Sequence, residues 1–517
     1  MFKPRDPGLI LKAAIFATGC AGIVAEFVLS TLAAYLTGKA VFQWTIVMSL
    51  MLFAMGLGSR LSRVFKDRLL DSFILVEFSL SLLCSSSAVL AYGLAGQVEN
   101  ISLFIYFVAV VIGGLIGLEI PLATRLNQSY EELRTNIANV MEKDYYGALL
   151  GGLFFAFFAL PSLGLTYTPI VLGFINFLTA SLLMWSFFHL TRRKKTLIAA
   201  FAGSLVILTS LVFLAQPIIL YGEQRQYKDK IIYARQTKFQ KIVITEFKRY
   251  YWLFMNGQEQ FSTYDEEKYH EPLVHPALKI AADRSKVLIL GGGDGLALRE
   301  VLKHHDVREI TLVDLDPVMT ELARTHPVLL EINQGAMLNP KVSVVNGDAG
   351  EFLKNDRDFY GVIMVDLPDP DSLELMHLYS ESFYRLAARH LVPGGVLVTQ
   401  AASPYFAPKA FLCINKTMRA AGFSVLPFHN QVPTMGEWGF VLGVKAGDLG
   451  EEALRERYLA QDYSDLSTRF LNNEAAEAMI RFGKGVFGPE KEAGIEVNTQ
   501  ANPVLQNYYG QGVWALY

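Results

Sequence analysis

The chain has 517 residues, of which 52% are hydrophobic and 18% are charged, and its formal net charge is −3. Because nucleic-acid-binding proteins carry a basic excess, this balance argues against a nucleic-acid partner. The three cysteines, Cys20, Cys84 and Cys413, form neither a disulfide framework nor a metal-ligand motif, so we expect no metal site.

The apolar residues are concentrated in the first half of the chain. Most of the seven apolar stretches there reach the roughly 20 residues that a membrane-spanning helix needs. The first stretch is too long, and too quickly followed by others, to be a cleaved signal peptide. The sequence therefore predicts an all-α polytopic membrane bundle over residues 1–221, with about seven spans at 9–36, 42–58, 73–96, 101–122, 145–163, 168–190 and 197–220.

Basic residues divide unequally between the alternate flanks of these stretches. The positive-inside rule places the basic-rich flanks, and with them the N-terminus, in the cytoplasm of a multi-pass cell-membrane protein. Seven crossings then predict that everything after Tyr221 lies outside. One set of flanks holds Lys3, Arg5, Lys12, Arg60, Arg63, Lys66, Arg68, Arg125, Arg134, Lys143, Arg192, Arg193, Lys194 and Lys195, and the other holds only Lys39.

Four ionisable residues fall within the predicted spans: Glu26, Glu77, Glu119 and His189. Charge is costly in lipid, so such side chains face a bundle interior. They could form a pocket for a cation, with Glu26 the deepest, or could pair between helices and near span ends. The residue pattern leaves both interpretations open.

Short alternating runs follow between Gln224 and about Ala282, rich in aromatic and β-branched residues. This alternation predicts a small antiparallel β domain over residues 222–284, with a tight hairpin turn at Asn256-Gly257.

From Val287 onward, strand and helix patterns alternate, which predicts a mainly parallel sheet with helices on both faces over residues 285–447. The last two strands lack a helix between them and predict an antiparallel edge hairpin. This arrangement resembles the Rossmann-like α/β sheet of class I S-adenosylmethionine-dependent transferases. Residues 448–517 form a polar, partly helical extension. Strands are predicted at 287–290, 310–314, 342–346, 361–366, 395–400, 423–427 and 438–444, and helices at 296–304, 317–325, 349–354, 380–391 and 408–421.

The chemistry is concentrated at the predicted carboxyl ends of the strands, where ligands of such sheets bind. The first strand runs into a glycine-dense turn, Gly291–Gly295, which allows close approach of a ligand. The strand ends are acidic, which argues against a phosphorylated dinucleotide and for a positively charged ligand. The acids are Asp294, Asp314, Asp316, Asp348, Asp366 and Asp369.

At this point the motifs carry a resemblance. The stretches GGGDG, LVDLD, NGDAGEF and DLPDP, together with QKIVITE, LYSESFY, LVPGGVLVTQ and VPTMGEWGF, resemble the spermidine synthases, or polyamine aminopropyltransferases. The match covers about residues 230–445, and the seven-span front resembles the membrane-fused branch of that family.

The resemblance implies transfer of the aminopropyl group of decarboxylated S-adenosylmethionine to an amine such as putrescine, giving spermidine and methylthioadenosine. The family's cosubstrate is made from a cytosolic metabolite, which argues against an external catalytic domain and leaves its side open. No tightly bound cofactor is implied. The expected partners are the amine, the lipid bilayer and further copies of the chain in a homo-oligomer.

The resemblance also assigns residues to roles. Asp366 is the candidate base, and Asp294 would attract the amine that replaces the carboxylate of S-adenosylmethionine. The nucleoside and cosubstrate site would comprise Gln240, Gln260, Gly291, Gly293, Asp294, Asp314, Asp348 and Ala349. The polyamine site would comprise Tyr269, His270, Asp294, Asp366 and Asp369.

Two departures and two alternatives stay open. Asp371, Ser372 and Leu373 stand where the family has a Gly-Pro pair beside the adenine, and Asp314 replaces a common Glu. The alternatives are a methyltransferase on the same sheet, and a transporter or sensor whose soluble domain binds polyamine without turning it over.

Overall fold

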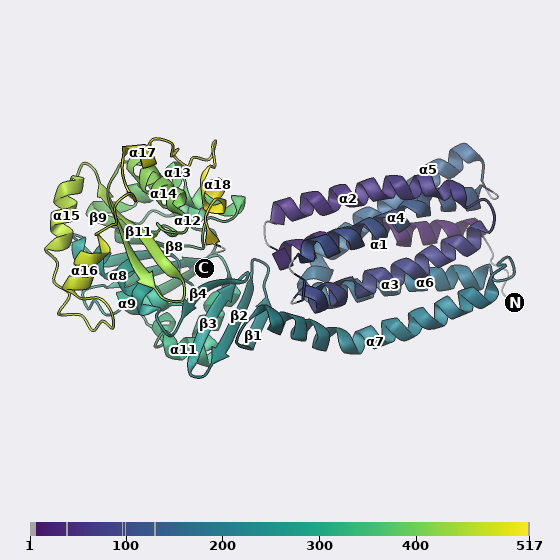
Figure 1. Cartoon of the computed structure of the whole chain (residues 1–517), viewed down its shortest axis with the longest axis horizontal. Coiled ribbons are helices and arrows are strands. Elements are labelled where there is room, and N and C mark those ends of the chain that lie inside the picture. Colours follow the sequence, from purple (N-terminus) through teal and green to yellow (C-terminus); the bar gives the residue numbers. More distant parts are fainter. Residues whose placement is uncertain (1–6, 38–39, 96, 99, 129–130, 515–517) are drawn as a thin grey trace. The chain divides into compact units, whose positions relative to one another are not determined.

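The computed structural model describes residues 7–37, 40–95, 97–98, 100–128 and 131–514. Within it the chain divides into two compact units, Met1–Lys230 and Ile231–Tyr517 (Figure 1). Lys3, Arg5 and Lys39, which entered the charge comparison, lie outside the described residues.

The first unit, here called the helical unit, is a bundle of long apolar helices. Glycines let neighbouring helices touch backbone to backbone: a Cβ on Gly117 would lie 2.1 Å from the carbonyl oxygen of Met55, and one on Gly147 would lie 2.1 Å from that of Phe16. The helices are α1 (Pro7–Thr37), α2 (Ala40–Leu61), α3 (Leu69–Ala95), α4 (Ile101–Asn127), α5 (Leu133–Phe154), α6 (Gly164–Ser186) and α7 (Lys194–Gln226).

Six helices of the described chain are long and apolar enough to cross a membrane, so the expected count of seven spans is not confirmed. The difference lies in one apolar run, Leu133–Ser186, which holds two of the expected spans. Within that run a π-helical segment, Phe155–Leu163, separates α5 from α6, and Gly164 adopts a positive φ of 63°.

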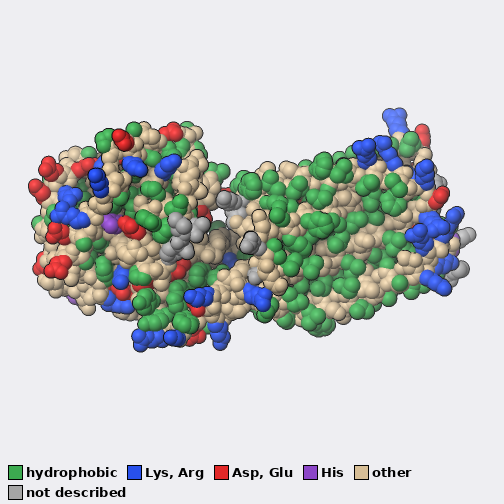
Figure 2. Space-filling view, viewed as in Figure 1, with side chains coloured by type: hydrophobic (Ala, Val, Ile, Leu, Met, Phe, Trp, Pro, Cys, Tyr) green, Lys and Arg blue, Asp and Glu red, His purple; other side chains and the backbone are tan. Residues whose placement is uncertain are grey.

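The surface of the helical unit is apolar along its length, and its Lys and Arg side chains gather mainly at one end (Figure 2). Large side chains such as Phe53, Phe107 and Trp185 are more than 60% exposed. Two contacts join the loops at the basic end: Arg192 and Arg193 donate backbone N–H groups to Asp71, and the Arg125 guanidinium donates to the carbonyl of Ser62.

The second unit, here called the soluble unit, begins with a four-stranded antiparallel sheet in the order β1-β2-β3-β4, as the sequence predicts. Its strands are β1 (Lys230–Gln236), β2 (Lys241–Phe247), β3 (Tyr250–Met255) and β4 (Gln258–Ser262). The alternating pattern was expected to continue to about Ala282. Instead the chain turns at residues 263–266 into helix α8 (Glu267–Ile280), which carries Tyr269 and His270 on its first turn.

A seven-stranded sheet follows in the order β10-β11-β9-β8-β5-β6-β7. Strands β5 to β9 are parallel, and β10 and β11 form the antiparallel hairpin expected at one side. The strands are β5 (Lys286–Gly291), β6 (Glu309–Asp314), β7 (Val342–Asn346), β8 (Tyr360–Asp366), β9 (Leu391–Gln400), β10 (Phe423–Val432) and β11 (Gly436–Lys445).

The helices predicted between these strands are present. They are α9 (Leu296–Val301), α10 (Pro317–Thr325), α12 (Ala349–Asn355), α13 (Glu381–Arg389) and α14 (Pro408–Ala420), with the additional α11 (Pro327–Ile332) and a 3₁₀ segment, Leu373–Tyr379. The Rossmann-like fold predicted from the sequence is therefore confirmed.

The C-terminal extension is part of the core of the soluble unit. Leu454, Tyr458 and Leu505 are at most 1% exposed and pack within the two hydrophobic clusters that cover the large sheet. Its helices are α15 (Glu451–Leu459), α16 (Asn473–Met479), α17 (Pro489–Glu492) and α18 (Leu505–Gly510), of which α18 lies against α14.

Candidate active site

The glycine turn after β5 packs two carboxylates against the sheet edge. Gly291 has a φ of 88°, and a Cβ there would lie 2.0 Å from the carbonyl oxygen of Asp366. A Cβ on Gly293 would lie 2.4 Å from the Asp314 carboxylate, to which the Gly293 N–H donates at 3.0 Å. Glycine is therefore required at both positions, because any side chain would displace an acidic residue of the edge.

Asp314 ends β6 with both carboxylate oxygens accepting backbone N–H groups, from Gly293 and, at 2.9 Å, from Asp316. Burial raises its pKa to about 6. The carboxylate is held rigidly beside the glycine turn, which is where the ribose role of Asp314 would place it.

Three other strand-end acids accept backbone N–H groups at the start of helices. Asp294 accepts from the Leu296 N–H at 2.8 Å, Asp316 from Val318 at 3.0 Å, and Asp348 from Glu351 at 2.8 Å. Asp316 also accepts from the Thr237 hydroxyl at 2.7 Å and is 1% exposed. Asp316 is therefore structural, whereas Asp294 and Asp348 each keep a second carboxylate oxygen that caps no helix.

Asp366 ends β8 and accepts a hydrogen bond at 2.8 Å from the Tyr269 hydroxyl. Tyr269 is 7% exposed on α8 and packs against Phe440, with ring centroids 5.3 Å apart. Burial raises the pKa of Asp366 to about 6, and the Asp294 charge acts in the same direction, whereas His270 and the Tyr269 hydrogen bond oppose the shift.

His270 supplies a positive charge behind these acids. Its Nδ1 lies 3.0 Å from Glu266 Oε2, and the same carboxylate accepts from Arg299 at 2.8 Å. Burial favours the neutral ring, but the hydrogen bond and charge of Glu266, with the Asp294 and Asp366 charges, raise the pKa of His270 to about 9. The imidazolium is therefore charged at neutral pH and offsets the neighbouring carboxylates.

Asp369 lies three residues beyond Asp366 and is held by two distant segments. The Tyr509 hydroxyl, on α18, donates to its Oδ2 at 2.7 Å, and Gln400 Nε2 approaches its Oδ1 at 3.3 Å. Burial raises the pKa of Asp369 to about 7, and both hydrogen bonds oppose that shift.

The departure at Asp371 is also linked to the C-terminal extension. Its carboxylate accepts from Gln258 on β4 at 2.9 Å, and its backbone carbonyl accepts from Gln506 on α18 at 3.0 Å. The loop that lacks the family's Gly-Pro pair is thus held between the small sheet and α18.

The remaining predicted residues lie on elements joined to this edge. Gln240 lies in the turn between β1 and β2, and that turn is tied to Asp316 by Thr237. The Gln260 side chain, on β4, donates to the carbonyl of Gln258 at 3.3 Å. Ala349 is the first residue of α12, directly after Asp348. Within the described part of the chain, neither Gln240 nor Gln260 hydrogen-bonds to the acids, so their roles stay predictions.

Comparison with known proteins identifies the family. Residues 266–453 match the model of the spermine/spermidine synthase domain. Polyamine aminopropyltransferase 2 of Aquifex aeolicus is 42% identical over 500 residues, which are 96% of this chain and 98% of the relative. The polyamine aminopropyltransferase of Leptospira interrogans is 36% identical over 94% of this chain and 95% of its own length. The chain belongs to the polyamine aminopropyltransferase family.

Like these relatives, the chain is a transferase. The similarity covers nearly the full length of the chain and therefore includes the helical unit. A crystal structure of spermidine synthase from Thermotoga maritima is also similar, at 24% identity and a TM-score of 0.43, over 51% of this chain and 87% of that one.

The sequence missed several residues that contact the candidate site. Tyr509 and Gln506 come from the polar extension, and His377, whose Nε2 lies 3.2 Å from the Asp348 carboxylate, follows the altered loop. A pair of aromatics near the C-terminus, Tyr508 and Tyr509, was the available signal, but it carries no spacing that points to Asp369.

We expect the acid limb of kcat/KM for the amine to fall as pH drops through about 7 and 6, because Asp369 and Asp366 then take up protons and lose their charge. In the Tyr509→Phe variant the midpoint of this fall should shift to higher pH by about one unit, because a hydrogen bond that favours the charged carboxylate of Asp369 is lost.

The matched control for that variant is Tyr508→Phe. The Tyr508 hydroxyl contacts the backbone of Gly494 and Glu496 and not the acids. Its pH profile should equal that of the unaltered protein. Equal profiles for all three proteins would show that Tyr509 does not tune Asp369.

Proposed function

We propose that the chain transfers the aminopropyl group of decarboxylated S-adenosylmethionine to an aliphatic amine such as putrescine, giving spermidine and methylthioadenosine, without a tightly bound cofactor. The observation that carries this proposal is the pair Asp366 and Asp369, each half-buried and each held by a tyrosine hydroxyl. Among the described residues, no three His, Cys, Asp or Glu side chains converge so as to hold a metal ion.

Electrostatics favours cationic substrates at this edge. Asp294, Asp366 and Asp369 are acids that burial makes costly to ionise, and the charged groups of the substrates relieve that cost. An amine substrate and a sulfonium cosubstrate bring two or more positive charges. A phosphorylated ligand would add to the repulsion instead.

The proposed reaction is a single displacement. The amine nitrogen forms a bond to the carbon beside the sulfonium as the carbon–sulfur bond breaks. The electron pair of the broken bond stays on the sulfur, which becomes a neutral thioether. The nitrogen's proton passes to the Asp366 carboxylate. An ordinary aspartate, with a pKa near 3.9, is a weak base toward an amine near 10.4, so raising the pKa of Asp366 to about 6 improves the match.

The tyrosines position the two acids for different tasks. Tyr269 fixes one oxygen of Asp366, which leaves the other to meet the attacking nitrogen. Tyr509 and Gln400 hold Asp369 for the ammonium group at the far end of the acceptor. Asp294, in the glycine turn, would receive the amine of the aminopropyl arm, whereas a methyltransferase has no use for an acid there.

The Asp366→Asn variant should lower kcat by about 100-fold or more, because general-base contributions run from about 10² to 10⁴. The Asn side chain can still accept from Tyr269, so the fold should survive. Chromatography of methylthioadenosine formed over time measures the rate.

The control is Asp358→Asn, just before the opposite end of β8, where Asp358 pairs with Lys286 on the surface. It should keep kcat within about 2-fold. Unchanged turnover in Asp366→Asn, with full activity in the control, would remove Asp366 from the proton transfer.

The Asp294→Asn variant should lose about 10-fold in its preference for decarboxylated over ordinary S-adenosylmethionine, since a charged hydrogen bond to the amine is lost and repulsion of the carboxylate disappears. Asn can still cap α9 through Leu296. Binding titrations with both compounds give the ratio, and an equal ratio in both proteins would refute the role of Asp294.

We further propose that the protein is a multi-pass cell-membrane protein with a cytoplasmic N-terminus and an external catalytic domain. The joined loops at the basic end support a single cytoplasmic end of the bundle. Helix α7 starts there at Lys194 and continues for 33 residues to Gln226. At 1.5 Å per residue it measures about 50 Å, which exceeds a hydrocarbon core of about 30 Å. The expected homo-oligomer also stays a proposal.

A reporter that is active only outside the cytoplasm, fused after Tyr517, should be active. The same reporter inserted in the loop between α6 and α7, at Arg192, should be silent, because that loop belongs to the basic end. Equal reporter activity at the two positions would mean that α7 does not cross, and the external proposal would be wrong.

A further inference from the structure

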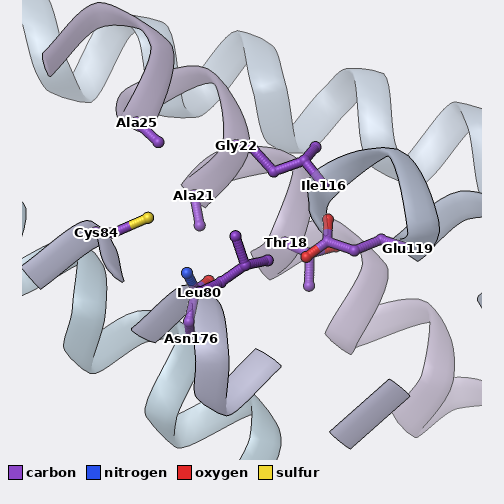
Figure 3. A pocket seen from close by; sticks show the side chains of 9 residues that line it. All are labelled: Thr18, Ala21, Gly22, Ala25, Leu80, Cys84, Ile116, Glu119 and Asn176. Carbon is purple, nitrogen blue, oxygen red and sulfur yellow. The ribbon is translucent and has the colours of Figure 1, made fainter. Parts of the chain in front are cut away.

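Buried carboxyl groups occur in both units, but their partners differ. In the helical unit the Glu119 carboxyl lies at a narrow space between α1, α3, α4 and α6 (Figure 3), and its hydrogen-bond partner is the Glu77 carboxyl. Two carboxyl groups that share a proton carry at most one negative charge. In the soluble unit two buried glutamates, Glu266 and Glu300, are paired with cations instead, so both of them stay charged.

Arg299, on α9, lies between these two glutamates. Its Nη2 donates to Glu266 Oε2 at 2.8 Å, and its Nε donates to Glu300 Oε1 at 2.8 Å. A further N–H, on Nη1, donates to the carbonyl of Ile332 at 3.0 Å. Arg299 is 7% exposed, Glu266 2% and Glu300 1%. Because an arginine side chain does not lose its proton in proteins, it supplies a permanent positive charge to both carboxylates.

Each glutamate also contacts a histidine. The carbonyl and the carboxylate of Glu266 lie 2.9 and 3.0 Å from His270 Nδ1, and both are acceptors, so this nitrogen carries a proton. On the other side, Glu300 Oε2 lies 3.0 Å from His275 Nε2, and His275 Nδ1 lies 2.9 Å from His304 Nε2. A buried chain of polar contacts therefore runs from His270, beside the acids, to His304, beyond the end of α9.

Stability alone does not account for such a buried ion chain. Withdrawing charges from water costs free energy, and well-packed apolar side chains of similar volume often serve equally well or better. The chain also joins the two sides of the candidate site. Helix α8 carries Tyr269 and His270, whereas α9 follows the glycine turn that contains Asp294. Its location therefore points to an electrostatic role at the acids.

The charges within the chain do not cancel. Its cations are His270, Arg299 and Lys303, and its anions are Glu266 and Glu300, which leaves one positive charge. Without Arg299, Glu266 would neutralise His270, and the acids at the strand ends would face a pair without net charge. Because Arg299 already neutralises Glu266, the charge of the imidazolium remains available to those acids.

Arg299 and Arg469 act on the His270 ring through Glu266, from which they lie 2.8 and 3.4 Å away. The Arg469 side chain is 57% exposed and also pairs with Glu267 at 3.1 Å, so solvent and that acid screen its charge. The acids that act on the ring are Glu266 on α8, Asp294 in the glycine turn and Asp366 on β8. Further charged groups on α8 and on β10 and β11 bond elsewhere: Lys279 to Asp465, Glu271 to backbone N–H groups of residues 469–471, and His429 to Glu437.

We propose that Glu266 and Arg299 are positioning residues of the transferase site, which act on the reaction through His270. Arg299 neutralises Glu266, and Glu266 holds the His270 ring with its positive charge beside the acids at the strand ends. That charge favours the uncharged form of the bound amine, whose lone pair attacks, and so prevents the acids from holding the nucleophile as an ammonium ion. The inference rests on the proposed function, because it concerns the amine of that reaction.

The first test follows the titration of His270 by nuclear magnetic resonance of the ring nitrogens, with the full chain in detergent micelles. A His270→Gln variant identifies the His270 signals. In Glu266→Gln, which is isosteric, the midpoint should fall by about two pH units or more, because the carboxylate that favours the charged ring is lost and burial favours the neutral one. The amide can still accept a hydrogen bond from Arg299.

The Arg299→Gln variant should move the same midpoint in the opposite direction, upward by about half a pH unit or more, since a neighbouring cation is removed and Glu266 is no longer shared. The amide can still donate to Glu266. Loss of packing would instead move both variants toward the ordinary value of a solvated histidine. The Glu266→Gln result does not depend on whether Arg299→Gln folds.

The matched control is Glu267→Gln. Glu267 is the next residue of α8, is 8% exposed and pairs with Arg469 rather than with His270. This variant removes the same charge from the same turn of the helix. The His270 midpoint should stay within about 0.3 pH unit of its value in the unaltered protein, because the contact of the ring with Glu266 is kept.

Steady-state kinetics at pH 8 supply the second test, since His270 is charged there in the unaltered protein and should be neutral in Glu266→Gln. In that variant the KM for putrescine should fall by about 10-fold, because a cation that repels the ammonium group is lost. The kcat at saturating amine should also fall by about 10-fold, because the bound nitrogen then keeps its proton. Damage to the packing alone would raise the KM.

Equal His270 midpoints in Glu266→Gln and the unaltered protein, or shifts of the same sign in Glu266→Gln and Arg299→Gln, would overturn the positioning role. A higher KM with unchanged kcat in Glu266→Gln would overturn it as well. If the midpoints shift as expected but the unaltered protein forms no methylthioadenosine with any amine, the proposed function is wrong and the arrangement of charges around His270 stands.

Discussion

The cost of withdrawing several neighbouring carboxylates from water is the constraint on which the catalytic edge depends. Asp294, Asp314 and Asp366 lie around one glycine turn, and burial raises the pKa of each. The fold offsets this cost with backbone N–H donors and with the His270 imidazolium, which Glu266 holds in place. This compensation is incomplete, because the pKa of each acid still lies above its usual value. Cationic substrates offset the remaining cost of ionising these acids. The same electrostatic attraction therefore accounts for both the strength of substrate binding and the selectivity for positive charge.

The sequence predicts the large sheet well because its signals are local. The parallel strands are short apolar runs, and each of them except β9 ends in an acid or is followed by one within three residues. The glycines of the turn can be read directly from the sequence. Helix α8 was missed because Pro272 and Pro276 lie inside it, and proline usually argues against a helix interior. Each proline removes one N–H donor from the helix interior, and burial of α8 against the sheet outweighs that loss.

The acceptor side of the site could not be predicted, because it joins segments far apart in the chain. Tyr509 reaches Asp369 from 140 positions away, and no local pattern marks it. The altered loop at Asp371 explains why such a contact is useful. Where the family's Gly-Pro pair is missing, Gln258 and Gln506 hold the loop from two sides. A departure that looked like a weakness of the resemblance is thus accompanied by contacts from the C-terminal extension.

The two units treat buried acids differently, and the difference bears on what each can do. In the soluble unit a fixed cation, His270, lies behind the acids, so the edge is already partly compensated before substrate binds. In the helical unit, Glu77 and Glu119 have no such partner among the described ion pairs. Compensation there must come from a ligand or from protons.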